Sequence, residues 1–138
     1  MSQRRLTGYD NVHFLDEAVE DMRRLAERSQ RILVEVFRAL KQLDRGELTP
    51  DPLHDFAKTG DLTDCGKVVI AIDGEPEYRI VVRAVSGSYE VCEVVAVEDR
   101  SGDLPYLLAG IRLERLDDSV RRSDVLRRIH RIRTQLDG

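Results

Sequence analysis

Three β-rich runs between Cys65 and Val97 constrain the fold of this chain more than any other part of its 138 residues. Two breaks of turn-forming residues, Gly74-Glu75-Pro76 and Ser86-Gly87-Ser88, separate them. Runs rich in β-branched residues that are joined by short Gly- or Pro-containing breaks are typical of antiparallel strands. We therefore expect an antiparallel meander. Its strands are predicted near 65–73, 78–85 and 89–97.

The first two runs alternate in character along the chain. Successive side chains of a strand point to opposite faces of the sheet. The apolar residues of one face are Val68, Ile70, Ile72, Tyr78, Ile80 and Val82. The opposite face carries three cations, Lys67, Arg79 and Arg83. One face is therefore expected to be core and the other to carry positive charge, whereas the third run is too uniformly apolar to assign its faces.

The part of the chain before the meander predicts a strand and two helices. The weak alternation near 6–14 is compatible with an opening strand. Apolar residues then recur at steps of three and four over 15–26 and over 32–43, which predicts two amphipathic helices. Arg28-Ser29 provides the break between them, and Gly46 provides a stop after the second. We expect an antiparallel helical hairpin here.

The segments on either side of the meander complete an α+β pattern. Residues 47–64 contain two prolines and Gly60 and predict a loop, which Leu53, Phe56 and Leu62 are expected to pin to the core. Pro105 suits the first turn of a helix that runs to about Leu113. A last helix follows a break at 117–119. The N-terminal strand and helical hairpin are thus expected to pack on the meander, within a domain of residues 1–116 that is followed by a basic helical extension over 117–138.

Charge is distributed unevenly along the chain. The net charge of −4 argues against non-specific nucleic-acid binding by the whole surface. Residues 116–138, however, hold six arginines and four aspartates. This tail either packs on the domain with solvated arginines or acts as a cationic arm that touches RNA phosphates. The candidate RNA-binding residues are Arg83, Arg121, Arg122 and Arg128.

Several classes of protein are not indicated by the sequence. No apolar run approaches the roughly 20 residues that are needed to span a bilayer, and no apolar segment follows the N-terminal arginines as it would in a secretory signal. We therefore expect a cytoplasmic protein with no membrane association. Cys65 and Cys92 have no metal-ligand spacing around them and are expected to be reduced structural thiols.

The order strand, two helices, three strands and C-terminal helix resembles the RelE/ParE superfamily of toxins from bacterial type II toxin–antitoxin modules. The resemblance covers roughly residues 6–116. It is carried by Leu62-Thr63-Asp64-Cys65-Gly66-Lys67, by Glu77-Tyr78-Arg79-Ile80-Val81-Val82-Arg83, and by Asp99-Arg100 with Tyr106 six residues after Arg100. The resemblance implies an α+β RelE/ParE-like fold and an antitoxin protein as partner.

The same resemblance implies one of two activities. RelE-like members cleave mRNA in the ribosomal A site, and ParE-like members poison DNA gyrase. The positions of the RelE-type cleavage residues are occupied here by Lys67, Arg79, Arg100 and Tyr106. The RelE group has a further lysine two residues after the first, where this chain has Val69. An inactive relative that is kept as a binding module, or an unrelated small interaction protein, is the alternative.

The four residues suit cleavage of RNA by its own 2′-hydroxyl. That reaction needs a base, positive charge on the developing phosphorane and a donor for the leaving oxygen. Arg79 and Arg100 offer bidentate hydrogen bonds to phosphate, and Tyr106 offers a ring for stacking or a hydroxyl for positioning. Lys67 would need burial or neighbouring cations to act as a base near neutral pH. No metal or organic cofactor is expected. Without the matched order, the same lysine and arginines would be ordinary solvated charges beside strands.

Overall fold

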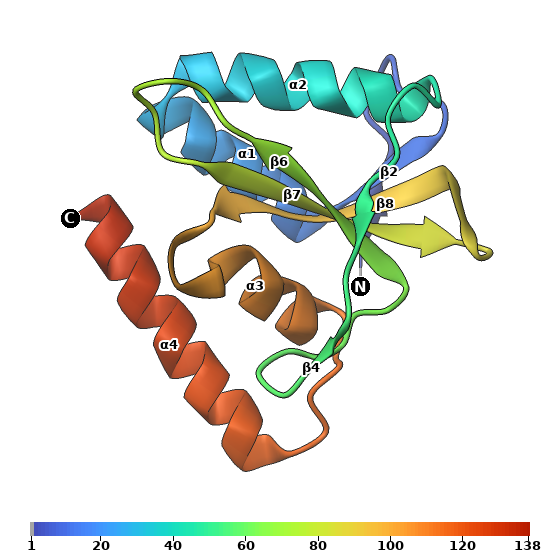
Figure 1. Cartoon of the computed structure of the whole chain (residues 1–138). Coiled ribbons are helices and arrows are strands. Elements are labelled where there is room, and N and C mark those ends of the chain that lie inside the picture. Colours follow the sequence, from blue (N-terminus) through green and yellow to red (C-terminus); the bar gives the residue numbers. More distant parts are fainter. Residues whose placement is uncertain (1) are drawn as a thin grey trace.

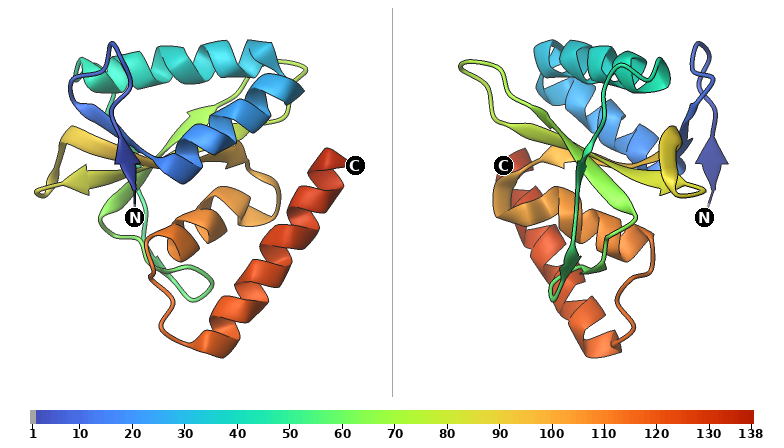
Figure 2. Two further views of the ribbon diagram at one scale, coloured as in Figure 1. Left: turned by 180° about the vertical axis from the view of Figure 1, so that it is seen from behind. Right: turned by 45° about the vertical axis from the view of Figure 1, so that its right-hand side comes forward.

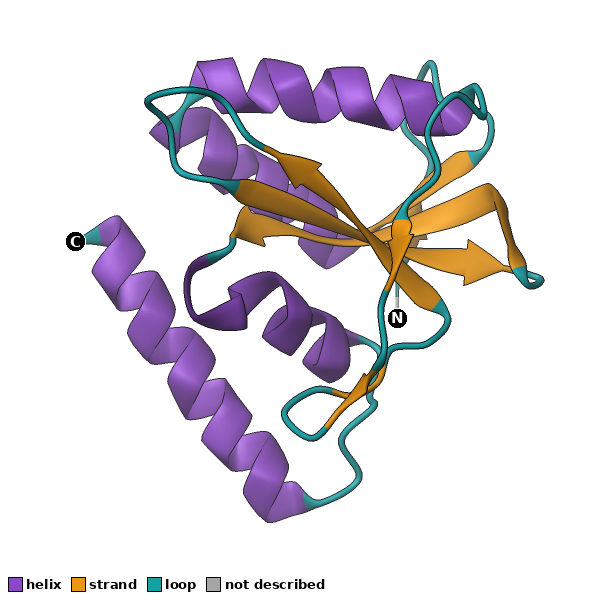
Figure 3. Ribbon diagram, viewed as in Figure 1, coloured by secondary structure: helices purple, strands orange, loops and turns teal. Residues whose placement is uncertain are grey.

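The computed structural model describes residues 2–138 as an α+β fold in which helices cover both faces of one mixed sheet (Figure 1). The helices are α1 (Asp16–Arg28), α2 (Gln30–Asp44), α3 (Leu104–Arg112) and α4 (Ser119–Asp137). Figure 3 shows that α1 and α2 lie on one face of the sheet, whereas α3 and α4 lie on the other. The sheet therefore forms the middle layer.

The main sheet has six strands in the order β1-β2-β8-β7-β6-β3. Their bounds are Gln3–Arg4 for β1, Val12–Leu15 for β2, Ser88–Asp99 for β8, Tyr78–Val85 for β7, Cys65–Ile70 for β6 and Asp51–Pro52 for β3. A separate hairpin consists of β4 (Asp55–Phe56) and β5 (Gly60–Asp61). A short 3-10 turn, Ser101–Asp103, leads from β8 into α3.

The predicted meander is confirmed, because β6, β7 and β8 pair antiparallel in sequence order. The predicted core face of β7 is confirmed as well, since Tyr78, Ile80 and Val82 are buried, but Val81 on the opposite face is also buried, so that face is not wholly polar. The first strand ends at Ile70 rather than near residue 73. The chain turns there through Gly74, whose φ of 82° is a conformation that glycine adopts without strain.

The uniform apolarity of β8 follows from its place in the sheet. This strand pairs with β7 on one side and with β2 on the other, and it contacts α1 on one face and α3 on the opposite face. All four residues from Val94 to Val97 are buried. A strand that is covered on both faces is apolar throughout rather than alternating, which is why the sequence pattern did not assign its faces.

The predicted N-terminal strand is wrong in its bounds. Two strands, β1 and β2, form an antiparallel pair in place of one strand near 6–14. The second of them pairs parallel with β8, with Val12 opposite Cys92. This long-range pairing makes the sheet mixed rather than purely antiparallel.

The predicted helical hairpin is confirmed. Ser29 ends α1 and caps α2, because its hydroxyl accepts a hydrogen bond from the backbone N–H of Ile32 at 3.2 Å. The predicted loop over 47–64 is only partly correct, since it contains the short strands β3, β4 and β5. Leu53 and Leu62 are buried as expected, but Phe56 is 37% exposed and lies on the surface.

A buried ion pair covers the part of β8 that extends beyond β2. The guanidinium of Arg112 donates to both carboxylate oxygens of Asp21, at 2.6 and 2.9 Å. The same carboxylate accepts from the backbone N–H of Val97 at 3.0 Å, and Arg112 donates to the carbonyl oxygen of Val95 at 2.9 Å. These two side chains thus satisfy backbone groups that a neighbouring strand would otherwise pair.

The helix α4 packs outside α3, away from the sheet (Figure 2). Asp118 caps its N-terminus, because its carboxylate accepts from the backbone N–H groups of Val120 and Arg121. Only Val125 and Ile129 are buried along it. Polar contacts add to this small apolar seam, because Asp137 accepts a hydrogen bond from Arg28 at 2.6 Å. The C-terminal extension is therefore docked on the domain. Within residues 2–138, no helix is long and apolar enough to cross a membrane.

Candidate functional site

Arg79 and Tyr106 meet at the centre of a cluster between the sheet and α3. Arg79 lies on β7 and points away from the core face, because its neighbours Tyr78 and Ile80 fill that face. Its Nη1 donates to the hydroxyl of Tyr106 at 2.5 Å, and its guanidinium carbon lies 5.8 Å from the centre of the tyrosine ring. Tyr106 stands in the first turn of α3, where Pro105 starts the helix. The strand and the helix thus hold these two side chains together.

Glu77 links Arg79 to Arg100. Its Oε2 accepts from the Nε and Nη2 of Arg79 at 3.0 and 2.8 Å, and it lies 3.8 Å from the Nε of Arg100. Glu77 was not among the predicted site residues, although its position two residues before Arg79 indicates a shared face. Burial alone would lower the pKa of Arg79, but hydrogen bonds with Tyr106 and Glu77 outweigh it and raise the pKa. Arg79 therefore stays cationic.

The two arginines of the cluster differ in accessibility. The Arg79 side chain is 18% exposed, and the Arg100 side chain is 61% exposed. Arg100 directly follows the end of β8, so its guanidinium extends into solvent beside the cluster. A ligand phosphate could thus reach Arg100 freely but would reach Arg79 only at the edge of its guanidinium.

Lys67 shares the face of the sheet that carries Arg79. It lies opposite Val81 on the neighbouring strand, and Val69 lies opposite Arg79. Directly opposed residues share a face, so Lys67 and Arg79 are diagonal neighbours about 7–8 Å apart. Lys67 is half-buried. Among the residues from 2 to 138, no ion pair or side-chain hydrogen bond involves its ammonium group.

The β4–β5 hairpin folds over the other side of Tyr106. The rings of Phe56 and Tyr106 stack with their centres 6.5 Å apart and an angle of 23° between their planes. This close approach depends on Gly110 of α3, because a Cβ there would lie 2.3 Å from the carbonyl oxygen of Thr59. The hairpin and α3 border a cavity of about 310 Å³. Its lining residues are Phe56, Ala57, Lys58, Thr59, Asp103 and Tyr106.

Arg83 lies on the same face of β7 as Arg79 but has a different partner. Its Nη2 forms an ion pair with the Oε1 of buried Glu93 at 2.9 Å. The other carboxylate oxygen of Glu93 accepts from the side chain of Gln3. Arg83 thus ties β7 to β8 and the N-terminal strand, and the cluster of Arg79, Arg100, Tyr106 and Glu77 does not include it.

The arginines of α4 fall on three sides of the helix. Arg121 and Arg128 face the hairpin and border a cavity of about 150 Å³ together with Lys58. Arg122 lies on another side of the helix, beside a cleft between α1, α3 and α4. Arg127 and Arg131 line the outward side. The structure therefore brings two of the three candidate RNA-binding arginines of the tail near the cluster and places the third away from it.

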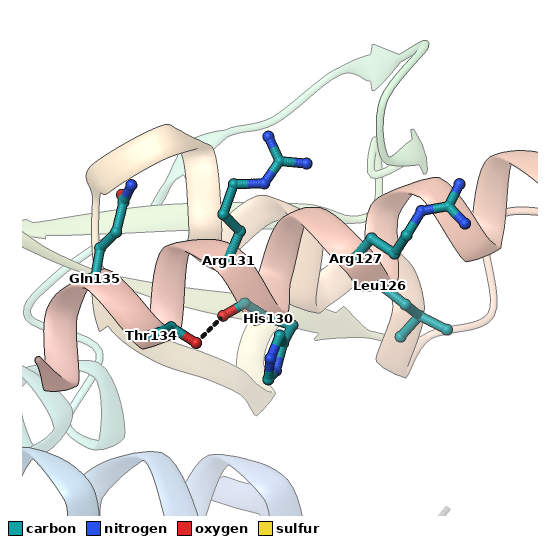
Figure 4. A pocket seen from close by; sticks show the side chains of 6 residues that line it. All are labelled: Leu126, Arg127, His130, Arg131, Thr134 and Gln135. Carbon is teal, nitrogen blue, oxygen red and sulfur yellow. Dashed lines mark hydrogen bonds between the residues drawn. The ribbon is translucent and has the colours of Figure 1, made fainter.

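A hollow of about 690 Å³ runs along the outward side of α4 (Figure 4). Figure 4 shows that its lining side chains all come from this one helix and that Arg131 and His130 point in different directions. The hydroxyl of Thr134 donates to the carbonyl oxygen of His130 at 2.9 Å. Because no other element contributes a polar group, this hollow lacks the convergent contacts of a binding site.

The chemistry of the cluster is that of an anion site beside an aromatic platform. Arg79 and Arg100 supply fixed positive charge, Tyr106 supplies a hydroxyl, and Phe56 supplies an exposed ring. None of the three histidines belongs to the cluster, and in the described part of the chain no group of three or more His, Cys, Asp or Glu residues could hold a metal ion. Comparison of the chain with models of protein families, with curated proteins and with solved structures gives no match.

Proposed function

We propose that this protein is the toxin of a type II toxin–antitoxin module and acts as a RelE-like endoribonuclease on mRNA in the ribosome. The observation that supports this function best is the cluster of Arg79, Arg100 and Tyr106, with Lys67 on the same face of the sheet. Lys67 and Arg79 come from two neighbouring strands, Arg100 directly follows a third strand, and Tyr106 comes from a helix. They are the set that the resemblance to the RelE/ParE superfamily implies for cleavage.

In the proposed reaction, the 2′-hydroxyl of one nucleotide attacks the adjacent phosphate. A new bond forms between the 2′-oxygen and phosphorus as the hydroxyl gives up its proton to water. The bond to the 5′-oxygen of the next nucleotide breaks as that oxygen takes up a proton from water, and a 2′,3′-cyclic phosphate results. Arg100 and the accessible edge of Arg79 stabilise the extra negative charge on the phosphorane. Lys67 lies diagonal to Arg79 on the same face of the sheet, where its ammonium group adds positive charge beside the phosphate. Tyr106 positions Arg79 through the hydrogen bond between their side chains.

The partner in this proposal is an antitoxin that covers the cationic cluster. Such a partner would supply carboxylates to Arg100, which is exposed, and an apolar side chain to the surface of Phe56. An amphipathic helix or an extended segment provides both kinds of contact.

A second function is favoured by Glu77. Its carboxylate already neutralises much of the charge on Arg79 and lies near Arg100, and Val69 stands where the RelE group has its second lysine. A protein with this arrangement could bind a target without cleaving RNA, either as a ParE-like inhibitor of DNA gyrase or as an inactive binding module. Trapped DNA breaks in cells with intact mRNA would select the gyrase inhibitor.

Growth arrest on inducible expression in a bacterial host tests the proposed function. We expect the wild-type chain to arrest growth and Arg79→Ala to abolish the arrest. Arg38→Ala is the matched control, because Arg38 is an exposed arginine on α2, across the sheet from the cluster. Retained toxicity of Arg79→Ala in a protein that is as abundant as the wild type would remove Arg79 from the mechanism.

A further inference from the structure

A basic groove leads away from the Phe56–Tyr106 cavity along α4. We define it by the three cations that border it, Lys58 of the hairpin and Arg121 and Arg128 of α4. Ala57 and Lys58 line both the groove and the cavity. The two therefore lie side by side, and a ligand that occupies the cavity beside Tyr106 can reach past Lys58 into the groove.

The arginines of the groove are free for a ligand. Arg121 and Arg128 are exposed, and in the described chain neither forms an ion pair. Asp124, the acidic residue of the groove, is already paired with Arg127. Arg121 and Arg128 are seven residues apart on one side of the helix, a rise of about 10.5 Å. This separation allows contacts with different phosphates of one strand.

The charge along this path is opposite to that of the whole molecule. The chain has a net charge of −4. From the cluster to the end of the groove, cationic side chains outnumber acidic ones. The cations are Lys58, Arg79, Arg100, Arg121 and Arg128, and the acids are Glu77, Asp103 and Asp124. A positive path on an otherwise acidic surface attracts a polyanion to one location rather than to the surface as a whole.

An aromatic ring stands where the path leaves the cluster. Phe56 packs on Tyr106 and is still 37% exposed, with its backbone held by the hairpin. A positive groove beside an exposed aromatic ring is the combination with which proteins bind single-stranded nucleic acids, because phosphates contact the cations and a base stacks on the ring. An acidic peptide would use the cations but would gain little from the ring.

We propose that the basic groove binds the backbone of single-stranded RNA beyond the nucleotide at the cluster, and that one base stacks on Phe56. This inference rests on the proposed function, since it describes how the mRNA continues past the site of cleavage. Lys58, Arg121 and Arg128 contact phosphates and carry no base preference. Phe56 accepts any base, because every base has a π-face.

Binding of a single-stranded RNA of 12 nucleotides, labelled with fluorescein and 2′-O-methylated so that it cannot be cleaved, tests the proposal. Affinity is measured by fluorescence anisotropy at several salt concentrations. The groove variant is Arg121→Gln with Arg128→Gln. The control is Arg122→Gln with Arg131→Gln, which removes the same charge from sides of the same helix that do not line the groove. Circular dichroism verifies that both variants keep the helix content of the wild type.

We expect the groove variant to bind at least fivefold more weakly than the control at low salt. Its plot of log affinity against log salt should be shallower by about 1.4, since each phosphate contact to a single strand contributes about 0.7. Phe56→Ala should weaken binding about tenfold without a change in this slope. Equal affinities of the groove variant and the control, or no saturable binding by the wild type, would overturn the proposal.

The two proposals fail in different ways. If the wild type binds the RNA through the groove but leaves cellular mRNA intact, the ribonuclease function is wrong and the groove stands. If the wild type cleaves mRNA while the groove variant binds and cleaves like the control, the groove is wrong and the ribonuclease function stands.

Discussion

Replacement of Asp21 by alanine should destabilise the fold more than any exposed charge change. Its carboxylate forms two hydrogen bonds with Arg112 and accepts one from the backbone of Val97. The Arg112 side chain is only 8% exposed, so the variant leaves a buried cation with the carbonyl oxygen of Val95 as its remaining partner. The backbone N–H of Val97, on the part of β8 that extends beyond β2, also loses its acceptor.

The size of the effect follows from these contacts. Removal of one partner of a buried ion pair typically costs about 3–5 kcal/mol, because the other charge stays buried without compensation. An unpaired buried backbone N–H can add about 1–3 kcal/mol, although water that enters the cavity recovers part of this. We expect the free energy of unfolding to fall by about 3–5 kcal/mol. Asp21→Asn, which keeps an acceptor for the backbone, should cost less than Asp21→Ala.

Equilibrium unfolding in urea measures this loss as a lower midpoint at an unchanged slope. Asp16→Ala is the matched control on the same helix, because Asp16 pairs with Arg4 at the surface. That exposed pair should contribute no more than about 1 kcal/mol. If Asp21→Ala costs as little as Asp16→Ala, the buried pair does not support the edge of β8 and the reasoning is refuted.

Three further predictions concern packing, pH and thiol chemistry. Gly110→Ala should lower the free energy of unfolding by about 1–3 kcal/mol, because the new methyl group collides with the backbone of Thr59 and displaces the β4–β5 hairpin. An unchanged urea unfolding curve would show that the hairpin does not depend on its close contact with Gly110. Partial burial opposes ionisation of Asp64, but hydrogen bonds and charge from Arg115 outweigh it and lower the pKa. The stability that this ion pair contributes is therefore present above the pKa of an unfolded aspartate and is lost as pH falls through the lower pKa of the folded state. Asp64→Asn should thus make the free energy of unfolding less dependent on pH between about pH 2 and 5. An unaltered pH dependence would contradict this. Burial, and to a smaller extent the charge of Asp64, raises the pKa of Cys65 to about 12. This thiol should therefore resist alkylation at pH 8 until the protein is unfolded. Rapid labelling of the native protein would show instead that the thiol is accessible.

The local elements could be predicted because their patterns are strong. The apolar steps of α1 and α2 and the alternation on β6 and β7 are properties of neighbouring residues, and each matched the structure. The parallel pairing of β2 with β8 could not be predicted, since it joins residues that are far apart in sequence and leaves no local pattern. Strands of two residues, such as β4, are too short to have a period.

Only the part of the candidate site that follows from the order of the elements could be predicted. Arg79, Arg100 and Tyr106 do meet, because each lies at a position that the order of elements brings to one place. Glu77 was given no role in the site, since an acid near an arginine in the sequence resembles any surface pair. Phe56 was expected in the core, but its hairpin positions it on the surface.

Primer extension on a translated transcript tests the central proposal most directly. The chain is expressed from an inducible promoter in a bacterial host, and the transcript is compared with and without a block to translation. We predict in-frame cuts that disappear when translation is blocked and that are absent with Arg79→Ala but present with Arg38→Ala. Intact mRNA in cells that contain the folded protein would contradict a ribosome-dependent ribonuclease.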